Sequence, residues 1–118
     1  MSRCIRPVLY VSGPVTGIEG DNVGAFAEAA ARLRAAGYRT HIPHEDVRPG
    51  TAWPSAMRTC LVSMLAQADG LALLPGWEKS RGAQLEAHVA RSLGMKVMEI
   101  NDWISGKETM NHEQTRRG

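Results

Sequence analysis

The stretch LALLPGWEKSRGAQLEAHVARSLG, residues 71–94, decides the fold class. Its first four residues, Leu71–Leu74, are all apolar, and a proline and a glycine follow them directly. A short unbroken apolar run is typical of a strand that is covered on both faces, and such strands belong to parallel sheets. Ser80 then opens an amphipathic helix that we expect to run to Gly94. A buried strand joined directly to a helix predicts an α/β protein.

The same alternation of strands and helices continues on both sides of this stretch. Breakers such as Gly13-Pro14 and the loop at 43–52 separate the segments. Strands joined through helices by short connections lie parallel, with right-handed crossovers. We therefore expect a three-layer α/β sandwich with a four-stranded parallel sheet, of the flavodoxin-like or Rossmann-like kind. The predicted order is a strand at 7–12, a helix from an Asn22 cap to Gly37, a strand at 38–42, a helix at 54–68, the strand and helix quoted above, a strand at 96–100 and one more turn at 101–104.

Length, charge and cysteine content limit the organisation and the partners. With 118 residues and a formal net charge of +2, the chain is expected to form one domain at 1–104, followed by a polar tail at 105–118. Its one clear basic cluster is Arg116-Arg117, so charge gives no basis for binding a polynucleotide. Cys4 and Cys60 form no CxxC pair and no secretory leader precedes them, which favours a cytoplasmic location. No apolar run approaches the ~20 residues of a membrane span, so no membrane partner is expected.

Three loops are expected to form the working edge of the sheet. In open parallel sheets, ligands bind beyond the carboxyl ends of the strands, near the point where the strand order reverses. The loops at that edge are 13–21, 43–52 and 75–79, together with the start of the third helix. Asp69 lies at the opposite edge, between a helix end and a strand start, and is expected to be a turn residue.

Glu86 carries the sharpest functional signal. A carboxylate that faces a sheet is unfavourable unless it is paired, hydrogen-bonded or reached by solvent. Helical side chains lean toward the N-terminus, so Glu86 points over Gly82 and Ala83, which are too small to cover it, and an open notch is predicted. The structural alternative pairs Glu86 with Arg58 or with the hydroxyl of Tyr10 and gives it no catalytic work. In a helical projection Glu86 falls in the middle of an apolar arc made of Gly82, Leu85, Val89, Ala90 and Leu93.

Other residues near the working edge leave two interpretations open. Trp77 either covers the sheet edge or stacks on a flat ligand, and Ser80 is either a helix cap or a phosphate ligand. The glycines of the first loop match neither the dinucleotide-binding nor the triphosphate-binding motif. The histidines lack metal-ligand spacing, so no metal is expected. No cofactor is expected either.

The motif residues resemble a known superfamily. The strongest part is LPGWEKSRGA at 74–83 followed by Glu86, and weaker parts are YVSGP at 10–14, Asn22 with Phe26, and Gly37-Tyr38. Together they resemble the nucleoside 2-deoxyribosyltransferase-like superfamily, and most closely its small branch of unknown function that is common in phages and prophages. The resemblance covers residues 7–100 and implies a parallel α/β sandwich, usually oligomeric, that acts on the N-glycosidic bond of nucleosides or nucleotides.

The resemblance also implies roles for single residues. Glu86 would be the nucleophile, and Tyr10 would help to orient it. Two features depart from the pattern: residues 58–62 lack the acidic residue that relatives often carry there, and the first loop lacks the basic residue that nucleotide-hydrolysing relatives use. The residues expected around the substrate are Ser12, Gly13, Pro14, Gly17, Asn22, Trp77, Ser80 and Gly82.

Three hypotheses about function follow. The first is a hydrolase or deoxyribosyltransferase that uses a glutamate nucleophile on the N-glycosidic bond of a small nucleoside or nucleotide. The alternative is a catalytically silent nucleotide-binding module, which the missing carboxylate at 58–62 favours. The third is a structural or partner-binding role with a closed cleft. A homo-oligomer, either a dimer or a tetramer, is expected from the small size and from the apolar helix face of Met57, Leu61, Met64 and Leu65.

Overall fold

A four-stranded sheet with all strands parallel forms the centre of the molecule. The computed structural model describes residues 7–15 and 18–106. The strand order β2-β1-β3-β4 changes direction between β1 and β3, which is where sheets of this kind bind their ligands. The predicted parallel sheet is therefore confirmed. Its strands are β1 (Val8–Ser12), β2 (Arg39–His41), β3 (Gly70–Leu73) and β4 (Lys96–Glu99).

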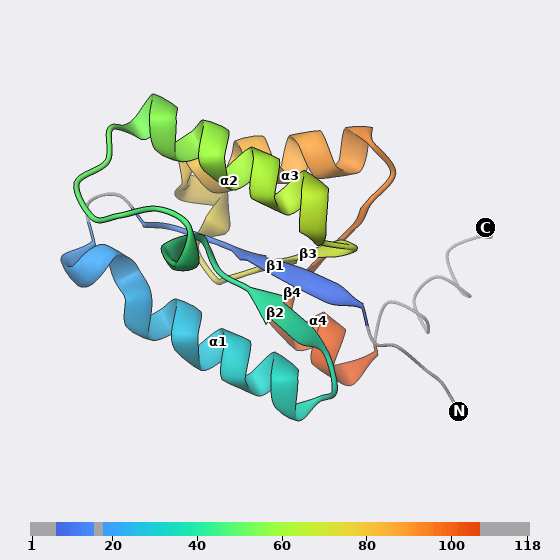
Figure 1. Cartoon of the computed structure of the whole chain (residues 1–118). Helices are drawn as coiled ribbons and strands as arrows, with labels where there is room; N and C mark the ends of the chain where they lie inside the picture. The colour runs from blue at the N-terminus through green and yellow to red at the C-terminus, as the bar shows by residue number, and fades with distance from the viewer. Residues whose placement is uncertain (1–6, 16–17, 107–118) are drawn as a thin grey trace.

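Two helices cover each face of the sheet, which confirms the predicted three layers. Figure 1 shows α2 and α3 on one face and α1 and α4 on the other. None of the described helices is both long and apolar enough to cross a membrane. The helices are α1 (Val23–Ala35), α2 (Trp53–Gln67), α3 (Arg81–Ser92) and α4 (Ile100–Ser105), with short turns η1 (Glu19–Asn22), η2 (Pro43–Glu45) and η3 (Trp77–Lys79).

Alternate residues of β1 face the two layers of helices, as the period of a strand requires. Leu9 and Val11 belong to the core under α1 and α4, whereas Tyr10 belongs to the core under α2 and α3. β3 is buried along its whole length, as predicted from the apolar run at 71–74. The two central strands therefore supply apolar residues to both cores.

Sequence signals at the helix ends act as expected, with one exception. The Ser80 hydroxyl accepts a hydrogen bond from the Ala83 N–H at 3.2 Å and caps α3. Asn22 stands at the cap position of α1, but its backbone is left-handed, with φ 61°, and its side chain does not cap the helix. The Asn22 amide instead donates to the Pro14 carbonyl at 2.9 Å. The predicted cap is therefore wrong, because the left-handed backbone turns the amide toward the first loop.

Two apolar residues at helix ends are exposed, one of which, Leu93, belongs to the predicted apolar arc of α3. Val23 has 46% of its surface exposed and Leu93 has 62%. Val23 is the first residue of α1 and Leu93 follows the last residue of α3, so both lie at the ends of their helices. The buried arc of α3 consists of small residues and one carboxylate: Ala83, Glu86, Ala87 and Ala90.

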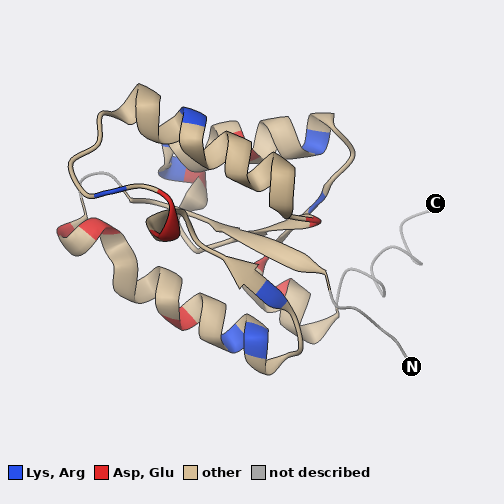
Figure 2. Ribbon diagram, viewed as in Figure 1, with Lys and Arg blue, Asp and Glu red and all other residues tan. Residues whose placement is uncertain are grey.

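The predicted apolar face of α2 is divided between the core and the surface. Met57 and Met64 are buried, with 8% and 0% exposure, so this part of the face is covered within the chain itself. Val62 and Leu65 are 68% and 45% exposed. Arg58 is the one charged residue of α2, and Figure 2 shows how few charges this helix carries. The outer surface of α2 is thus mostly uncharged.

Asp69 lies at the amino ends of the strands, opposite the loops that follow their carboxyl ends, and it bonds to the start of β1. Its carboxylate accepts the Val8 N–H at 2.8 Å, and its own N–H donates to the Val8 carbonyl at 2.7 Å. The predicted turn residue is confirmed, and its contacts join the end of α2 to the start of β1.

Gly13 is expected to be indispensable for packing. A Cβ atom added at this position would lie 2.7 Å from Leu74 Cβ, so Gly13→Ala forces the two chain segments apart. We expect the substitution to lower the free energy of unfolding by about 1–3 kcal/mol, measured by urea titration. Gly24→Ala is the matched control, because nothing lies within 4 Å of its added Cβ and alanine favours helix. A urea unfolding midpoint of Gly13→Ala equal to that of the wild type would contradict the prediction.

Candidate active site

A cavity of about 640 Å³, counting its open mouth, lies at the working edge of the sheet. Its walls come from the loop after β1, the loop after β2, the first half of α2 and the start of α3. The predicted loops 13–21 and 43–52 both line the cavity, and so does the predicted start of the third helix, from Ser80 onward. No residue of the predicted loop 75–79 is among the described lining residues. The lining residues are Gly13, Val15, Asp21, Pro43, His44, Val47, Arg48, Trp53, Ala56, Met57, Cys60, Ser80, Gly82, Ala83 and Glu86.

Glu86 lies in the wall of this cavity and is 5% exposed. One carboxylate oxygen, Oε1, accepts a hydrogen bond from the Ser12 hydroxyl at 2.5 Å. Ser12 is the last residue of β1 and is fully buried. In the described part of the chain Glu86 is bonded neither to Arg58 nor to Tyr10. The two pairings of the structural alternative are therefore not made.

Burial raises the pKa of the Glu86 carboxyl to about 7, although the Ser12 hydrogen bond opposes part of that rise. The carboxyl therefore changes its charge close to neutral pH. A carboxylate with such a pKa inside a cavity is typical of sites that carry out acid, base or nucleophilic chemistry.

Tyr10 lies near Glu86 without bonding to it. The side chain is fully buried, and its hydroxyl has no hydrogen-bond partner among the described residues. Burial, followed by the nearby negative charge of Glu86, raises the pKa of Tyr10 well above its ordinary value. Its ring stacks on that of His41, with 5.7 Å between centroids. Tyr10 and Glu86 therefore lie near each other, but the hydrogen bond to Glu86 comes from Ser12.

Trp53 is a cavity residue that the sequence analysis missed. It is the first residue of α2, and the Arg81 guanidinium lies 3.8 Å from the centre of its ring. Trp53 lines the cavity, whereas Arg81 is not among the described lining residues. Trp77 packs against the core under α2 and α3 and does not line the cavity. Its packing matches the first of its two interpretations, a covering role.

The small residues at the start of α3 leave the room that the predicted notch requires. A Cβ added to Gly82 would lie 3.0 Å from Met57 Sδ and 3.9 Å from Trp53 Nε1. Gly82, Ala83 and Glu86 all line the cavity. The absence of a side chain at position 82 therefore lets α3 approach α2 while Glu86 stays open to the cavity.

The loop before α1 reaches the cavity through an unusual backbone. Gly20, Asp21 and Asn22 are all left-handed, with φ of 62°, 54° and 61°. Left-handed Asp and Asn are uncommon, and such strain gathers at functional sites. The His44 Nε2–H donates to the Asp21 carbonyl at 2.7 Å, which holds the loop against η2. Asp21, His44 and Arg48 all line the cavity, and the turn composition of 20–22 was the signal available for Asp21.

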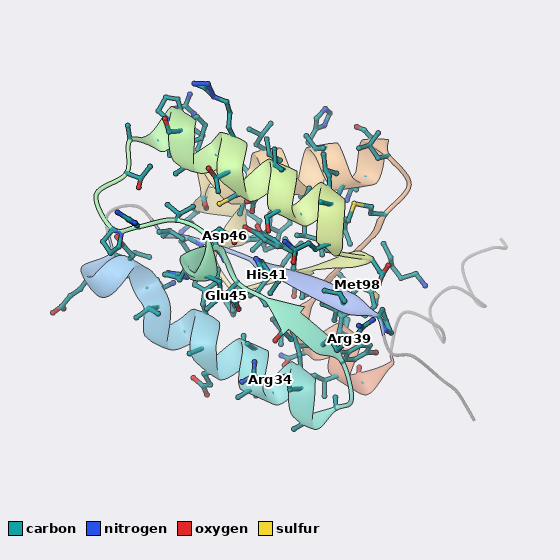
Figure 3. All side chains as sticks on the ribbon, viewed as in Figure 1. Arg34, Arg39, His41, Glu45, Asp46 and Met98 are labelled. Carbon is teal, nitrogen blue, oxygen red and sulfur yellow. The ribbon has the colours of Figure 1, made fainter. Side chains whose placement is uncertain are left out.

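A second polar cluster lies beside Tyr10. The His41 ring places Nε2 2.5 Å from Asp46 and Nδ1 3.3 Å from Glu45, and Figure 3 labels these three residues. The Ser63 hydroxyl of α2 lies 3.0 Å from His41 Nε2. Burial acts to raise the pKa of Asp46, but hydrogen bonds from His41 and Ser63 outweigh it and hold that pKa below its ordinary value. This cluster joins the end of β2, η2 and α2 under the Tyr10 ring.

Cys60 is the cavity residue from the middle of α2. It belongs to the core, and burial raises the pKa of its thiol to about 11. A thiol with that pKa stays protonated at neutral pH. In the described part of the chain, no three His, Cys, Asp or Glu side chains gather closely enough to hold a metal ion.

The predicted site residues divide into three groups. Glu86 and three of the predicted substrate ligands, Gly13, Ser80 and Gly82, line the cavity. Gly17 lies outside the described residues. The described residues that do not line the cavity are Tyr10, Ser12, Pro14, Asn22 and Trp77, of which Ser12 reaches it through Glu86 and Pro14 and Asn22 bond to each other.

Comparison with known proteins gives one family match. A family model described as a domain of unknown function (DUF4406) matches residues 7–99. This range includes the whole sheet and every residue that lines the cavity. The comparison with curated proteins finds no match.

Glu86→Gln is expected to remove a pH dependence of stability. Because the pKa of Glu86 is raised to about 7 from an ordinary 4.5, the folded protein binds this proton more tightly than the unfolded chain. The free energy of unfolding therefore falls as pH rises from about 4.5 to about 7, by about 3 kcal/mol, and this contribution is constant above pH 7. Glutamine does not ionise, so the variant gains stability relative to the wild type over that range.

Urea unfolding at pH 5 and pH 8 measures this difference. Glu28→Gln on α1 is the matched control, since it removes an exposed carboxylate. An equal stability difference between Glu86→Gln and the wild type at both pH values would contradict the prediction.

Proposed function

The chain belongs to the DUF4406 family, a domain of unknown function, and we propose that it cleaves the N-glycosidic bond of a small nucleoside or nucleotide with Glu86 as the nucleophile. One observation carries the proposal: a carboxylate that is 5% exposed, with a pKa of about 7, lies in the wall of an open cavity at the carboxyl edge of a parallel sheet. Structural carboxylates are normally paired with cations, whereas Glu86 has a hydroxyl as its partner. The resemblance to the nucleoside 2-deoxyribosyltransferase-like superfamily gives the class of substrate.

The cavity wall has the composition that a nucleoside needs. Apolar side chains such as Val47, Trp53 and Met57 suit the planar base, and an indole is a side chain on which a base can stack. Polar residues from the loops, among them Asp21 and Ser80, suit the hydroxyl groups of the sugar.

The reaction would follow the scheme of retaining glycosidases. The ionised Glu86 attacks C1′ of the sugar, an ester bond forms between its oxygen and C1′, and the C1′–N bond breaks. The electron pair of that bond leaves with the base, which takes up a proton. Water then attacks C1′, its proton is lost, and the Glu86 carboxylate is released. A second base in place of water would give transfer, so the same residues serve a hydrolase or a deoxyribosyltransferase.

A catalytically silent nucleotide-binding module is the second candidate. The α2 residues in the cavity wall are Trp53, Ala56, Met57 and Cys60, so in the described residues this helix provides no carboxylate to the substrate. Tight binding of a nucleotide without turnover, unchanged by Glu86→Gln, would favour this candidate over the enzyme.

Two expectations about the whole protein are also proposals. A cytoplasmic location agrees with the free thiol of Cys60. A homo-oligomer, either a dimer or a tetramer, is supported by the exposed Val62 and Leu65 on the weakly charged α2. Light scattering at micromolar concentration tests this second proposal, and a monomeric mass would contradict it.

Release of free base is the direct test of the proposed reaction. The protein is incubated with 2′-deoxynucleosides, ribonucleosides and their 5′-monophosphates, and the free base is measured by liquid chromatography. We expect Glu86→Gln to lower the rate at least about 10³-fold, because removal of a nucleophile abolishes the covalent step. Glu28→Gln on α1 controls for the loss of a negative charge. Base release that is undiminished in Glu86→Gln would exclude Glu86 as the nucleophile.

Trp53 and Trp77 are expected to differ in their effect on substrate binding. Trp53→Leu removes a ring from the cavity wall and should raise KM about tenfold, with a smaller change in kcat. Trp77→Leu is the matched control, because Trp77 packs on the core away from the cavity and leucine keeps an apolar contact there. Steady-state kinetics on the best substrate of the panel measures both. A larger KM change in Trp77→Leu would reverse the assignment.

A further inference from the structure

We propose that Ser12 is a positioning residue, whose hydroxyl holds one oxygen of Glu86 and leaves the other, Oε2, to attack the sugar. The inference rests on the proposed function and assigns Ser12 a role in place of the substrate contact expected from the sequence. It also assigns to Ser12 the orienting role that the resemblance gives to Tyr10.

The Ser12 hydroxyl is fully engaged by its hydrogen bond to Glu86. Ser12 Oγ lies 2.5 Å from Glu86 Oε1, and both residues are buried, with 0% and 5% exposure. A hydroxyl has one hydrogen to donate, and the one on Ser12 is engaged by the carboxylate. A substrate hydroxyl or phosphate oxygen that needs a donor therefore finds none at Ser12.

The strand fixes the donor in place. Ser12 ends β1 in register with Leu73 of β3, and its carbonyl accepts the Leu74 N–H at 2.8 Å. The next residue, Gly13, packs so closely on Leu74 that an added Cβ would lie 2.7 Å away. The hydroxyl therefore projects from a hydrogen-bonded and closely packed strand end, where it holds Glu86 more rigidly than a loop residue would.

Tyr10 is the competing donor, and its surroundings argue against it. Tyr10 and Ser12 lie two residues apart on β1 and so face the same layer. The Tyr10 hydroxyl has no hydrogen-bond partner in the described part of the chain, and its ring is held by stacking on His41. Glu86 therefore depends on Ser12 for its orientation.

The hydrogen bond from Ser12 also lowers the pKa of Glu86. Burial opposes ionisation of Glu86, and the Ser12 hydrogen bond favours it. Loss of the hydroxyl removes a bond to the charged form, and such bonds correspond to a shift of about 1–2 pH units. Ser12 thus sets both the direction of the carboxylate and the pH above which it attacks.

The pH profile of kcat/KM in Ser12→Ala tests the proposal. We expect the acidic limb, near pH 7 in the wild type, to move upward by about 1–2 pH units, and kcat at high pH to fall about tenfold while KM changes less. Ser12→Thr keeps a hydroxyl and should return the limb toward its wild-type position. Ser63→Ala, which changes a buried serine of α2 outside the cavity wall, should leave the limb in place.

Two results would overturn the proposal. One is an unmoved limb in Ser12→Ala, and the other is a large rise in KM with an unchanged kcat, which would make Ser12 a substrate ligand. A carbon-13 NMR titration of the Glu86 carboxyl in the wild type and Ser12→Ala measures the same shift without turnover. If no substrate of the panel is cleaved by the wild type, the proposed reaction fails. Equal NMR midpoints in the two proteins would instead overturn the role of Ser12 alone.

Discussion

The burial of one carboxylate is the constraint on which this structure depends. Glu86 is almost wholly removed from water and has one short hydrogen bond, from Ser12, to offset that loss. The bond exists because the end of β1 and the first turns of α3 lie close together. Leu74 packs directly against Gly13, and Met57 packs directly against Gly82. The close packing at both positions depends on the absence of a side chain. The backbone around the cavity is therefore arranged to bring a β1 hydroxyl to an α3 carboxylate.

The two faces of the sheet differ in the polarity of the groups buried on them. The core under α1 and α4 contains aliphatic and aromatic residues such as Leu9, Phe26 and Trp103, and the Trp103 indole donates to the Leu71 carbonyl at 3.0 Å. The core under α2 and α3 includes the polar groups of Tyr10 and Cys60, and Glu86 and Ser12 meet on the same side. The apolar core under α1 and α4 thus stabilises the fold, and this stability offsets the cost of burying polar groups on the other face of the sheet.

Much of the fold could be predicted from the sequence, because it depends on local signals. The apolar run at 71–74 gave β3, the Ser80 cap gave the start of α3, and the spacing in α3 placed Glu86 on the buried side. The site was harder, because it depends on contacts between distant segments. Trp53 stands at a helix start that is far in sequence from Glu86, and no local pattern reveals that it meets Arg81. The strand period places Ser12 and Tyr10 on one face of the sheet, but only the three-dimensional contact shows which of them bonds to Glu86.

The same burial that destabilises the ionised Glu86 makes it sensitive to the charge of a bound ligand. In the open cavity its pKa of about 7 leaves both charge states populated near neutral pH. A sugar whose C1′ develops positive charge as the base departs favours the ionised carboxylate, and it does so strongly where water is excluded. A neutral sugar in its ground state lacks this effect. In the proposed reaction, the interaction with Glu86 would therefore be stronger in the transition state than in the bound substrate, which is the condition for catalysis, and the Ser12 hydroxyl would support the charged form in both.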